Sequence, residues 1–84
     1  MAYNVVFKKS VYRDLKKLPK TEVVNILDKI EKDLTKNPHS YPMLKGQFTG
    51  LRKYRIGDYR IIYALLGDDV LILRIGHRKE VYVR

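Results

Sequence analysis

The sequence predicts an α+β fold in the order β-α-α-β-β-β-β, with two N-terminal helices packed on one face of a mostly antiparallel, twisted sheet. Apolar residues recur every three or four positions between residues 11 and 34, which is helical spacing. From residue 51 onward, short β-prone runs alternate with Gly-Asp turns, which is typical of hairpins. With 84 residues there is room for one modest core, so we expect a single domain spanning residues 1–84.

The first strand and the first helix are predicted within residues 3–19. Residues 3–7 form a β-prone run that ends at two lysines. Ser10 is expected to cap the helix, because its hydroxyl can accept a hydrogen bond from a free amide of the first turn. Pro19 is expected to end the helix. The apolar face of this first helix comprises Val11, Leu15 and Leu18, which are spaced by four and three positions.

The second helix is predicted to begin near Lys20 and to stop before Pro38, because the residue before a proline is disfavoured in helical conformation. Asp28 and Lys32 lie four positions apart and are expected to pair on the solvent side. The apolar face of this helix comprises Val23, Leu27, Ile30 and Leu34, widened by Val24 and Ile26.

A loop and four strands are expected in the C-terminal half. Proline and glycine residues mark 38–50 as a loop. Two Gly-Asp turns, at residues 57 and 67, separate the first three of these strands, and residues 76–79 form a short connection to the last one. The strands are predicted at residues 51–56, 59–66, 70–75 and 80–83.

The charge balance indicates a polyanionic partner. Lysine and arginine number 18 against 9 acidic residues, which gives a net charge of +9, and such an excess suits nucleic acid or an acidic protein. The sequence has no cysteine, which excludes a disulfide framework and a cysteine-based zinc site. It has neither a signal peptide nor an apolar run longer than the six residues 61–66. We therefore expect a cytoplasmic protein without membrane contact.

The arginines of the sheet half are expected to line the sheet face that the helices leave uncovered. Alternation along the strand places Lys53 and Arg55 on one side, with Tyr54 and Ile56 facing the helices. Arg60 begins the neighbouring strand and is expected to join the same patch, together with Arg78. The patch can also be interpreted as a charged face that keeps the sheet soluble, but clustering like charges costs free energy unless a partner offsets it.

This pattern is compatible with RNA cleavage that needs no metal or cofactor. RNA carries its own nucleophile, so the protein must supply a base for the 2′-OH, an acid for the 5′-oxygen and cations for the phosphate. Two candidates for the base stay open, His77 and Lys53. The candidate phosphate ligands are Arg55, Arg60 and Arg78. Tyr82 can stack on a base or assist proton transfer.

Three segments of the sequence are notable: residues 44–46, the run Gly-Leu-Arg-Lys-Tyr-Arg-Ile-Gly-Asp-Tyr-Arg-Ile-Ile-Tyr at 50–63, and the run Ile-Gly-His-Arg-Lys-Glu-Val-Tyr at 75–82. Together they resemble the RelE/ParE toxin superfamily. This resemblance implies a toxin of a type II toxin–antitoxin pair. Its RelE branch enters the A site of the 30S ribosomal subunit and cuts mRNA there without a metal, leaving a 2′,3′-cyclic phosphate. The implied partners are the ribosome, mRNA and a cognate antitoxin with an acidic C-terminal segment.

The resemblance also carries residue roles, matched position by position. The residues of the RelE-type site fall on Lys53, Arg55, Arg60, His77, Arg78 and Tyr82. A basic residue common in the loop falls on Lys45, which we expect to bind RNA together with Arg52 and Arg74.

Two other functions fit the same sequence. The ParE branch of the superfamily inhibits DNA gyrase by binding and has no nuclease site. An inactive, basic nucleic-acid-binding member of the fold is the other alternative. His77→Ala and Arg78→Ala separate a nuclease from a gyrase inhibitor, because only the nuclease is expected to lose activity while keeping its fold.

Overall fold

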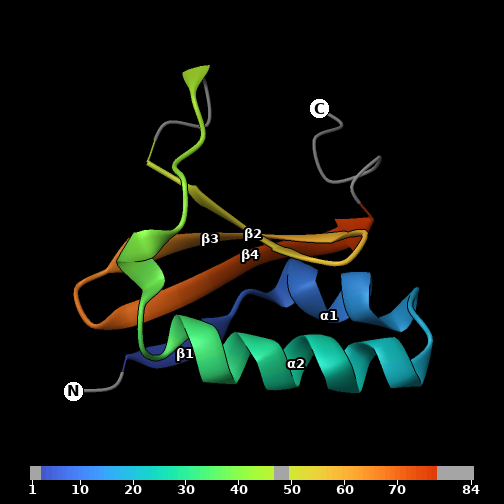
Figure 1. Ribbon diagram of the computed structural model, residues 1–84. Coiled ribbons are helices and arrows are strands. Elements are labelled where there is room, and N and C mark those ends of the chain that lie inside the picture. The colour runs from blue at the N-terminus through green and yellow to red at the C-terminus, as the bar shows by residue number, and fades with distance from the viewer. Residues whose placement is uncertain (1–2, 47–49, 78–84) are drawn as a thin grey trace.

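The computed structural model describes residues 3–46 and 50–77. Both helices lie on one face of a four-stranded sheet whose strand order is β1-β4-β3-β2 (Figure 1). This arrangement confirms the predicted α+β fold class, whereas the strand expected at residues 80–83 lies outside the described residues. The elements, in chain order, are β1 (Asn4–Phe7), α1 (Lys9–Lys16), α2 (Lys20–Leu34), the 3₁₀ helix η1 (Pro38–Ser40), β2 (Arg52–Ile56), β3 (Tyr59–Leu66) and β4 (Asp69–His77).

The sheet is mixed, and its antiparallel part dominates as predicted. β2 pairs with β3 and β3 with β4 in antiparallel register, whereas β1 runs parallel to β4. β4 is longer than expected and includes Gly76 and His77, so the prediction that these two residues belong to a connection was wrong. They are held in the strand because Arg60 and Tyr59 of β3 pair with them.

A β-bulge in β4 keeps its apolar residues on the helix-covered face. Ile62 pairs with Arg74 and Tyr63 with Ile72, so Leu73 is the extra residue. The bulge shifts the alternation by one position. Val70 and Ile72 before the bulge, and Ile75 after it, are therefore all buried in the core.

α2 contributes the helical half of the core. Ile26, Ile30 and Leu34 are fully buried against the sheet, and the expected Asp28–Lys32 ion pair is present at 3.1 Å. The prediction that Val24 widens the buried stripe was wrong, because this residue is 68% exposed. Residue 24 lies on the side of α2 that faces away from the sheet.

α1 lies against β4 at the part of its edge that β1 does not cover. The prediction that Ser10 caps this helix was wrong: α1 begins at Lys9, and the Ser10 hydroxyl donates to the Leu73 carbonyl at 2.8 Å. The Lys8 amide likewise donates to Ile72. α1 thus satisfies backbone groups of β4 that a further strand would otherwise pair with.

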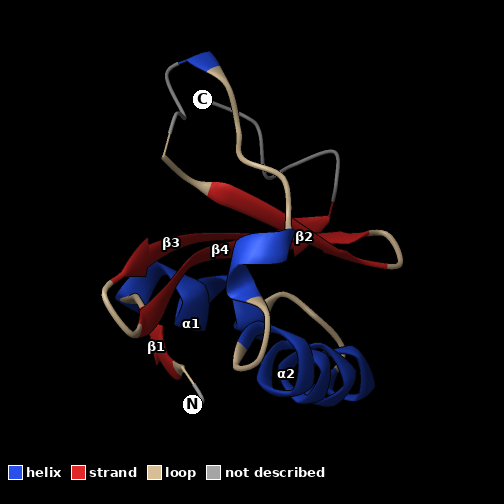
Figure 2. Cartoon of the chain, turned by 60° about the vertical axis from the view of Figure 1, so that its left-hand side comes forward, coloured by secondary structure: helices blue, strands red, loops and turns tan. Residues whose placement is uncertain are grey.

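Residues 41–46 rise from η1 on the side of the sheet away from the helices (Figure 2). The Leu44 amide donates to Leu51, and the Lys53 amide donates to Pro42, so this segment covers the first part of the outer edge of β2. Neither α1 nor α2, the α-helices of the described residues, is long and apolar enough to span a membrane.

Candidate nucleic-acid interface

Two arginines face each other on the uncovered side of the sheet. Arg55 of β2 pairs directly with Arg60 of β3, and residues opposed in this way share a face. Tyr54, Ile56 and Ile61, their neighbours along the strands, are buried on the helix side. The expected clustering of Arg55 and Arg60 is therefore present at the β2–β3 turn.

Lys53 lies in the next row of the same face. It pairs with Ile62, which in turn pairs with Arg74. Ile62 is buried. A buried apolar side chain therefore lies beside the basic residues of β2 and β3 on this face. Lys53, Arg55 and Arg60 together form what we call the basic face.

Arg52, one residue before Lys53, points in a different direction. Its guanidinium donates to the backbone carbonyls of His39 at 3.0 Å and Tyr41 at 2.7 Å. These two bonds attach the chain after η1 to β2. The structure thus gives Arg52 a contact with backbone and separates it from the basic face.

Arg74 is held at the opposite edge of the sheet. Its Nε atom lies 3.0 Å from Asp14 Oδ2 and its Nη2 atom 3.3 Å from Asp14 Oδ1, while the Ile75 amide donates to the same carboxylate at 2.9 Å. Asp14 is buried, and three donors of β4 satisfy it. Sequence reasoning missed Asp14, although its position three residues after Val11 and four before Leu18 places it on the inner side of the helix.

His77 lies on the opposite side of the sheet from the basic face. It pairs with Tyr59, and the two rings meet edge to face with centroids 6.1 Å apart. Tyr59 packs against the core beneath the helices. The expectation that His77 lies at the mouth of the basic face was therefore wrong. Neighbouring residues of a strand face opposite sides, and it is Gly76, paired with Arg60, that lies on the side of the basic face.

The remaining predicted site residues divide into two groups. Lys45 is exposed and precedes Gly46, whose φ of 68° is the left-handed conformation that favours glycine. Arg78 and Tyr82 lie outside the described residues, so their roles stay predictions.

Three tyrosines surround the junction of α2, η1 and β2. The Tyr54 hydroxyl donates to Asp33, and its ring packs edge to face against Tyr41 with centroids 4.8 Å apart. The Tyr63 hydroxyl donates to Pro38 O at 2.6 Å. Burial raises the pKa of Tyr63 to about 12, which the nearby Arg52 charge counteracts only in part. Burial and the Asp33 carboxylate also raise the pKa of Tyr54 above its ordinary value. These hydroxyls are held protonated as hydrogen-bond donors.

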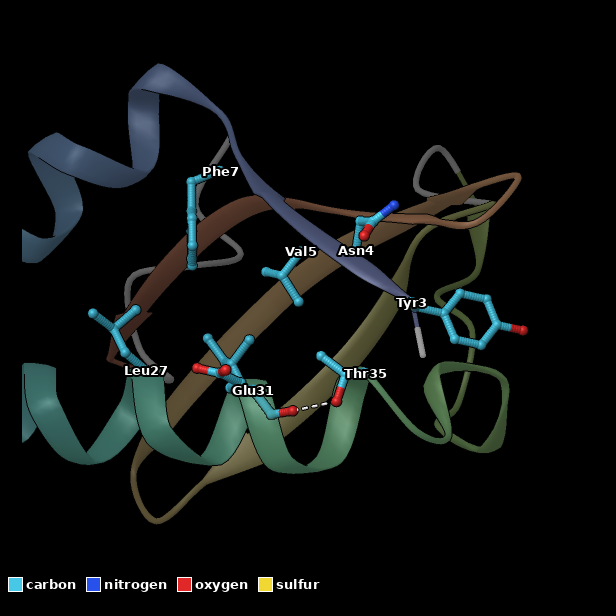
Figure 3. Close-up of a pocket in the computed structure, with 8 residues that line it drawn as sticks. Tyr3, Asn4, Val5, Phe7, Leu27, Glu31 and Thr35 are labelled. Carbon is cyan, nitrogen blue, oxygen red and sulfur yellow. Dashed lines mark hydrogen bonds between the residues drawn. The ribbon is translucent and has the colours of Figure 1, made fainter. Parts of the chain in front are cut away.

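A separate hollow of about 470 Å³ lies between β1 and α2 (Figure 3). Val5, Phe7 and Leu27 line it with apolar groups, and Glu31 and Thr35 provide its polar side. The Tyr3 amide donates to the Thr35 carbonyl and ties β1 to the end of α2. This hollow contains none of the predicted site residues. Within residues 3–46 and 50–77, no group of three or more His, Asp or Glu side chains is placed to hold a metal.

Comparisons with known proteins agree with this fold. A family model described as the ParE toxin of the type II toxin–antitoxin system parDE matches residues 5–82. Toxin RelG of Mycobacterium tuberculosis is 34% identical over 89 aligned positions, covering 100% of both chains. The toxin–antitoxin complex RelBE2 of the same organism contains a similar chain, with a TM-score of 0.87, 30% identity and 95% of each chain covered. A chain of the RelB–RelE antitoxin–toxin complex of Methanococcus jannaschii has a TM-score of 0.63 and 25% identity, with 92% of this chain and 94% of that chain covered.

The matched family consists of toxins of type II toxin–antitoxin systems. The chain belongs to this class, and within it to the RelE/ParE toxin superfamily.

Proposed function

We propose that this toxin is a ribosome-dependent mRNA endonuclease that cuts mRNA in the ribosomal A site and so inhibits translation in the cytoplasm. The observation that carries this proposal is the direct pairing of Arg55 with Arg60 on a sheet face that the helices leave uncovered. Two guanidinium groups on neighbouring strands can bind the oxygens of one anion together. A phosphodiester is an anion that two such groups can bind.

The reaction needs only proton transfer and charge stabilisation. The 2′-oxygen attacks phosphorus and loses its proton to a base, while the bond to the 5′-oxygen breaks and that oxygen gains a proton. The products are a 2′,3′-cyclic phosphate and a free 5′-OH. Arg55 and Arg60 would stabilise the negative charge that grows on the phosphate oxygens.

The register favours Lys53 over His77 as the group nearest the reacting 2′-OH. Lys53 shares the basic face with Arg55 and Arg60, whereas His77 packs against Tyr59 on the other side of the sheet. We therefore assign proton transfer to Lys53 and a role in holding the end of β4 to His77. An antitoxin with an acidic segment would silence the toxin by covering the basic face.

A translation reaction with purified components tests this function. The protein is added to a reporter mRNA with and without ribosomes, and primer extension maps any cuts. We expect cuts in phase with codons only when ribosomes are present. Lys53→Ala and Arg60→Ala should abolish them, and His77→Ala should retain more activity than either. Lys29→Ala removes an exposed charge from α2 and serves as the matched control.

Gyrase inhibition is the second candidate, because the family model that matches residues 5–82 is that of ParE toxins. An intact message, unimpaired translation and inhibited DNA supercoiling would together favour this function and contradict ours.

A further inference from the structure

The outward side of α1 carries positive charge only. Lys9, Arg13 and Lys16 are exposed and recur at steps of four and three, so they form a row along one side of the helix. Val11 and Asp14 lie on the inner side and are buried. We call the row of Lys9, Arg13 and Lys16 the α1 stripe.

No acidic side chain within the described residues neutralises the α1 stripe. The helix contains one acidic residue, Asp14, whose carboxylate is bound to Arg74 and to the Ile75 amide of β4. The other ion pair of the described residues joins two side chains of α2. The three cations of the stripe are therefore available to a partner outside the chain.

α2 shows that an exposed helix of this protein does not require such a stripe. Its exposed charges between residues 28 and 32 are two acids and two lysines, Asp28, Lys29, Glu31 and Lys32. An acid and a lysine of this group form an ion pair at 3.1 Å. Because a surface of interspersed charges of both signs already keeps a protein soluble, solubility does not explain the single sign of the α1 stripe.

The stability of the helix does not explain the stripe either. Lys9 is the first residue of α1, where the helix dipole favours negative charge, and the first turn contains no acidic residue. Lys9 and Arg13 also lie four positions apart, and like charges at this spacing slightly destabilise a helix. A partner of opposite charge is the remaining explanation for the row.

The α1 stripe and the basic face lie on opposite sides of the sheet. α1 packs against β4 on the helix-covered side (Figure 1), and the stripe is on the side of α1 turned away from the buried Val11. The basic face lies on the side that the helices leave uncovered. Because the sheet separates them, the two surfaces require two different segments of polyanion.

A convex row of cations is suited to the phosphate backbone of folded RNA. Lysine and arginine bind phosphate oxygens without reading the base sequence. Tyr12, next to Arg13, is 56% exposed and offers a ring that can stack on an unpaired base.

An acidic peptide fits the stripe less well. The apolar hollow that such a peptide would fill lies between α1 and α2, where Leu15, Leu18 and Val23 line it. Of the three stripe residues, Lys16 lines this hollow and the other two do not. A peptide seated there would leave most of the stripe without a partner.

We propose that the α1 stripe binds the phosphate backbone of ribosomal RNA while mRNA occupies the basic face. The inference rests on the proposed function in that it takes the ribosome as the target. It also gives the ribosome dependence a physical basis. Free mRNA meets one cationic surface of the toxin, whereas the ribosome presents a second polyanion to the opposite side.

Lys9→Gln/Arg13→Gln/Lys16→Gln, the stripe variant, removes the three charges and keeps side chains that favour a helix. Affinity for isolated 30S subunits without mRNA is measured by fluorescence anisotropy of the dye-labelled protein over a range of KCl concentrations. Affinities for a short single-stranded RNA and for polyglutamate are measured in the same way. Thermal unfolding reports whether the fold is retained.

The matched control removes three charges from exposed positions in α2 and just after it. It is the variant Lys29→Gln/Lys32→Gln/Lys36→Gln. Both variants therefore have the same net charge, so any difference between them reports where the charges lie.

We expect the stripe variant to bind 30S subunits about tenfold more weakly than the control variant. The slope of log K against log salt should be smaller by about 2, because each of three lost phosphate contacts removes about 0.7. The two variants should match in melting temperature and in affinity for short single-stranded RNA. In the ribosome assay, the KM for ribosomes should rise in the stripe variant and kcat should stay the same.

Equal 30S affinity of the two variants would overturn the inference, as would an absence of 30S binding by the wild type. Weaker binding of polyglutamate by the stripe variant, with 30S affinity equal to that of the control, would assign the stripe to an acidic protein and overturn it as well. The ribosome assay separates this result from the proposed function. Cleavage in phase with codons and unchanged 30S affinity in the stripe variant remove the inference alone. Stripe-dependent 30S binding without mRNA cleavage by the wild type removes the proposed endonuclease alone.

Discussion

Single residues at the two edges of the sheet hold the surrounding segments in place. Asp14 joins α1 to β4 through three donors, and Arg52 joins the chain after η1 to β2 through two carbonyls. Both contacts use charged groups to satisfy other polar groups, which would be costly to leave unpaired in a partly buried site. Arg52 and Arg74 therefore contribute to the fold, and their expected binding of RNA stays a prediction.

Asp14→Ala is expected to lower the free energy of unfolding by about 2 kcal/mol, because it leaves the Ile75 amide and the Arg74 guanidinium without their acceptor. Urea unfolding measures this loss. Asp28→Ala is the matched control. Its ion pair with Lys32 is solvent-exposed, so we expect a loss of no more than about 0.5 kcal/mol. Equal losses for the two variants would contradict the role given to Asp14.

Tyr63 makes the stability depend on pH in the alkaline range. Its pKa is about 12 in the folded protein, against about 10 in an unfolded chain. Below about pH 10 both states keep the proton, and the stabilising contribution is fully present. As the pH rises toward 12 the unfolded state loses the proton first, so the contribution is lost.

Tyr63→Phe removes this dependence, together with the hydrogen bond to Pro38. We expect the variant to be less stable than the wild type near neutral pH, with a difference that shrinks by about 1 kcal/mol at about pH 11. Urea unfolding at about pH 8 and about pH 11 measures the difference. A difference that stays constant between the two pH values would contradict the assignment.

At the scale of elements, parts of two strand edges are covered by segments that are not regular strands. α1 covers part of β4, and residues 42–44 cover the beginning of β2. Covering these edges leaves fewer backbone groups available for pairing with another chain. The cover on β2 ends at Lys53, so it reaches only the first residue of the basic face.

Arg52→Met is expected to loosen the segment after η1 without unfolding the sheet. The amides of Leu44 and Lys53 donate to Leu51 and Pro42 in the present arrangement. Hydrogen exchange should therefore accelerate at these two amides and stay slow at Ile61 in the core. Uniform acceleration at all three positions would show that Arg52 supports the whole fold instead.

At the scale of the whole molecule, we expect RNA binding to depend more on where each charge lies than on the net charge of +9. Arg55→Ala and Lys29→Ala lower the net charge by the same amount, one on the basic face and the other on the exposed side of α2. We expect Arg55→Ala to change the free energy of unfolding by no more than about 0.5 kcal/mol, because Arg55 is exposed.

RNA binding should depend on which of the two charges is removed. Arg55→Ala is expected to weaken affinity and to reduce the salt slope by about 0.7, whereas Lys29→Ala should change neither. Anisotropy titrations of both variants over a range of KCl concentrations check this. Equal losses for the two variants would indicate binding by net charge alone.

The sequence was sufficient where local pattern and tertiary environment agree. The spacing from Val23 to Leu34 predicted α2, and strict alternation around Tyr54 and Ile56 predicted which side of β2 faces the helices. It failed for Ser10 and Val24, where packing against β4 and the direction of α2 decided the outcome. Neither effect is encoded within a few residues of the position concerned.

For the candidate site, the sequence by itself determined the pairing of Arg55 with Arg60, because a two-residue Gly-Asp turn fixes the register of the hairpin that carries both. Only the tertiary structure decided that His77 lies behind the sheet, that Arg52 and Arg74 are bound to other segments, and that Gly76 lies beside Arg60. The physical reason is that these outcomes depend on the bulge at Leu73 and on contacts between residues far apart in the chain, and neither leaves a periodic signal in the sequence.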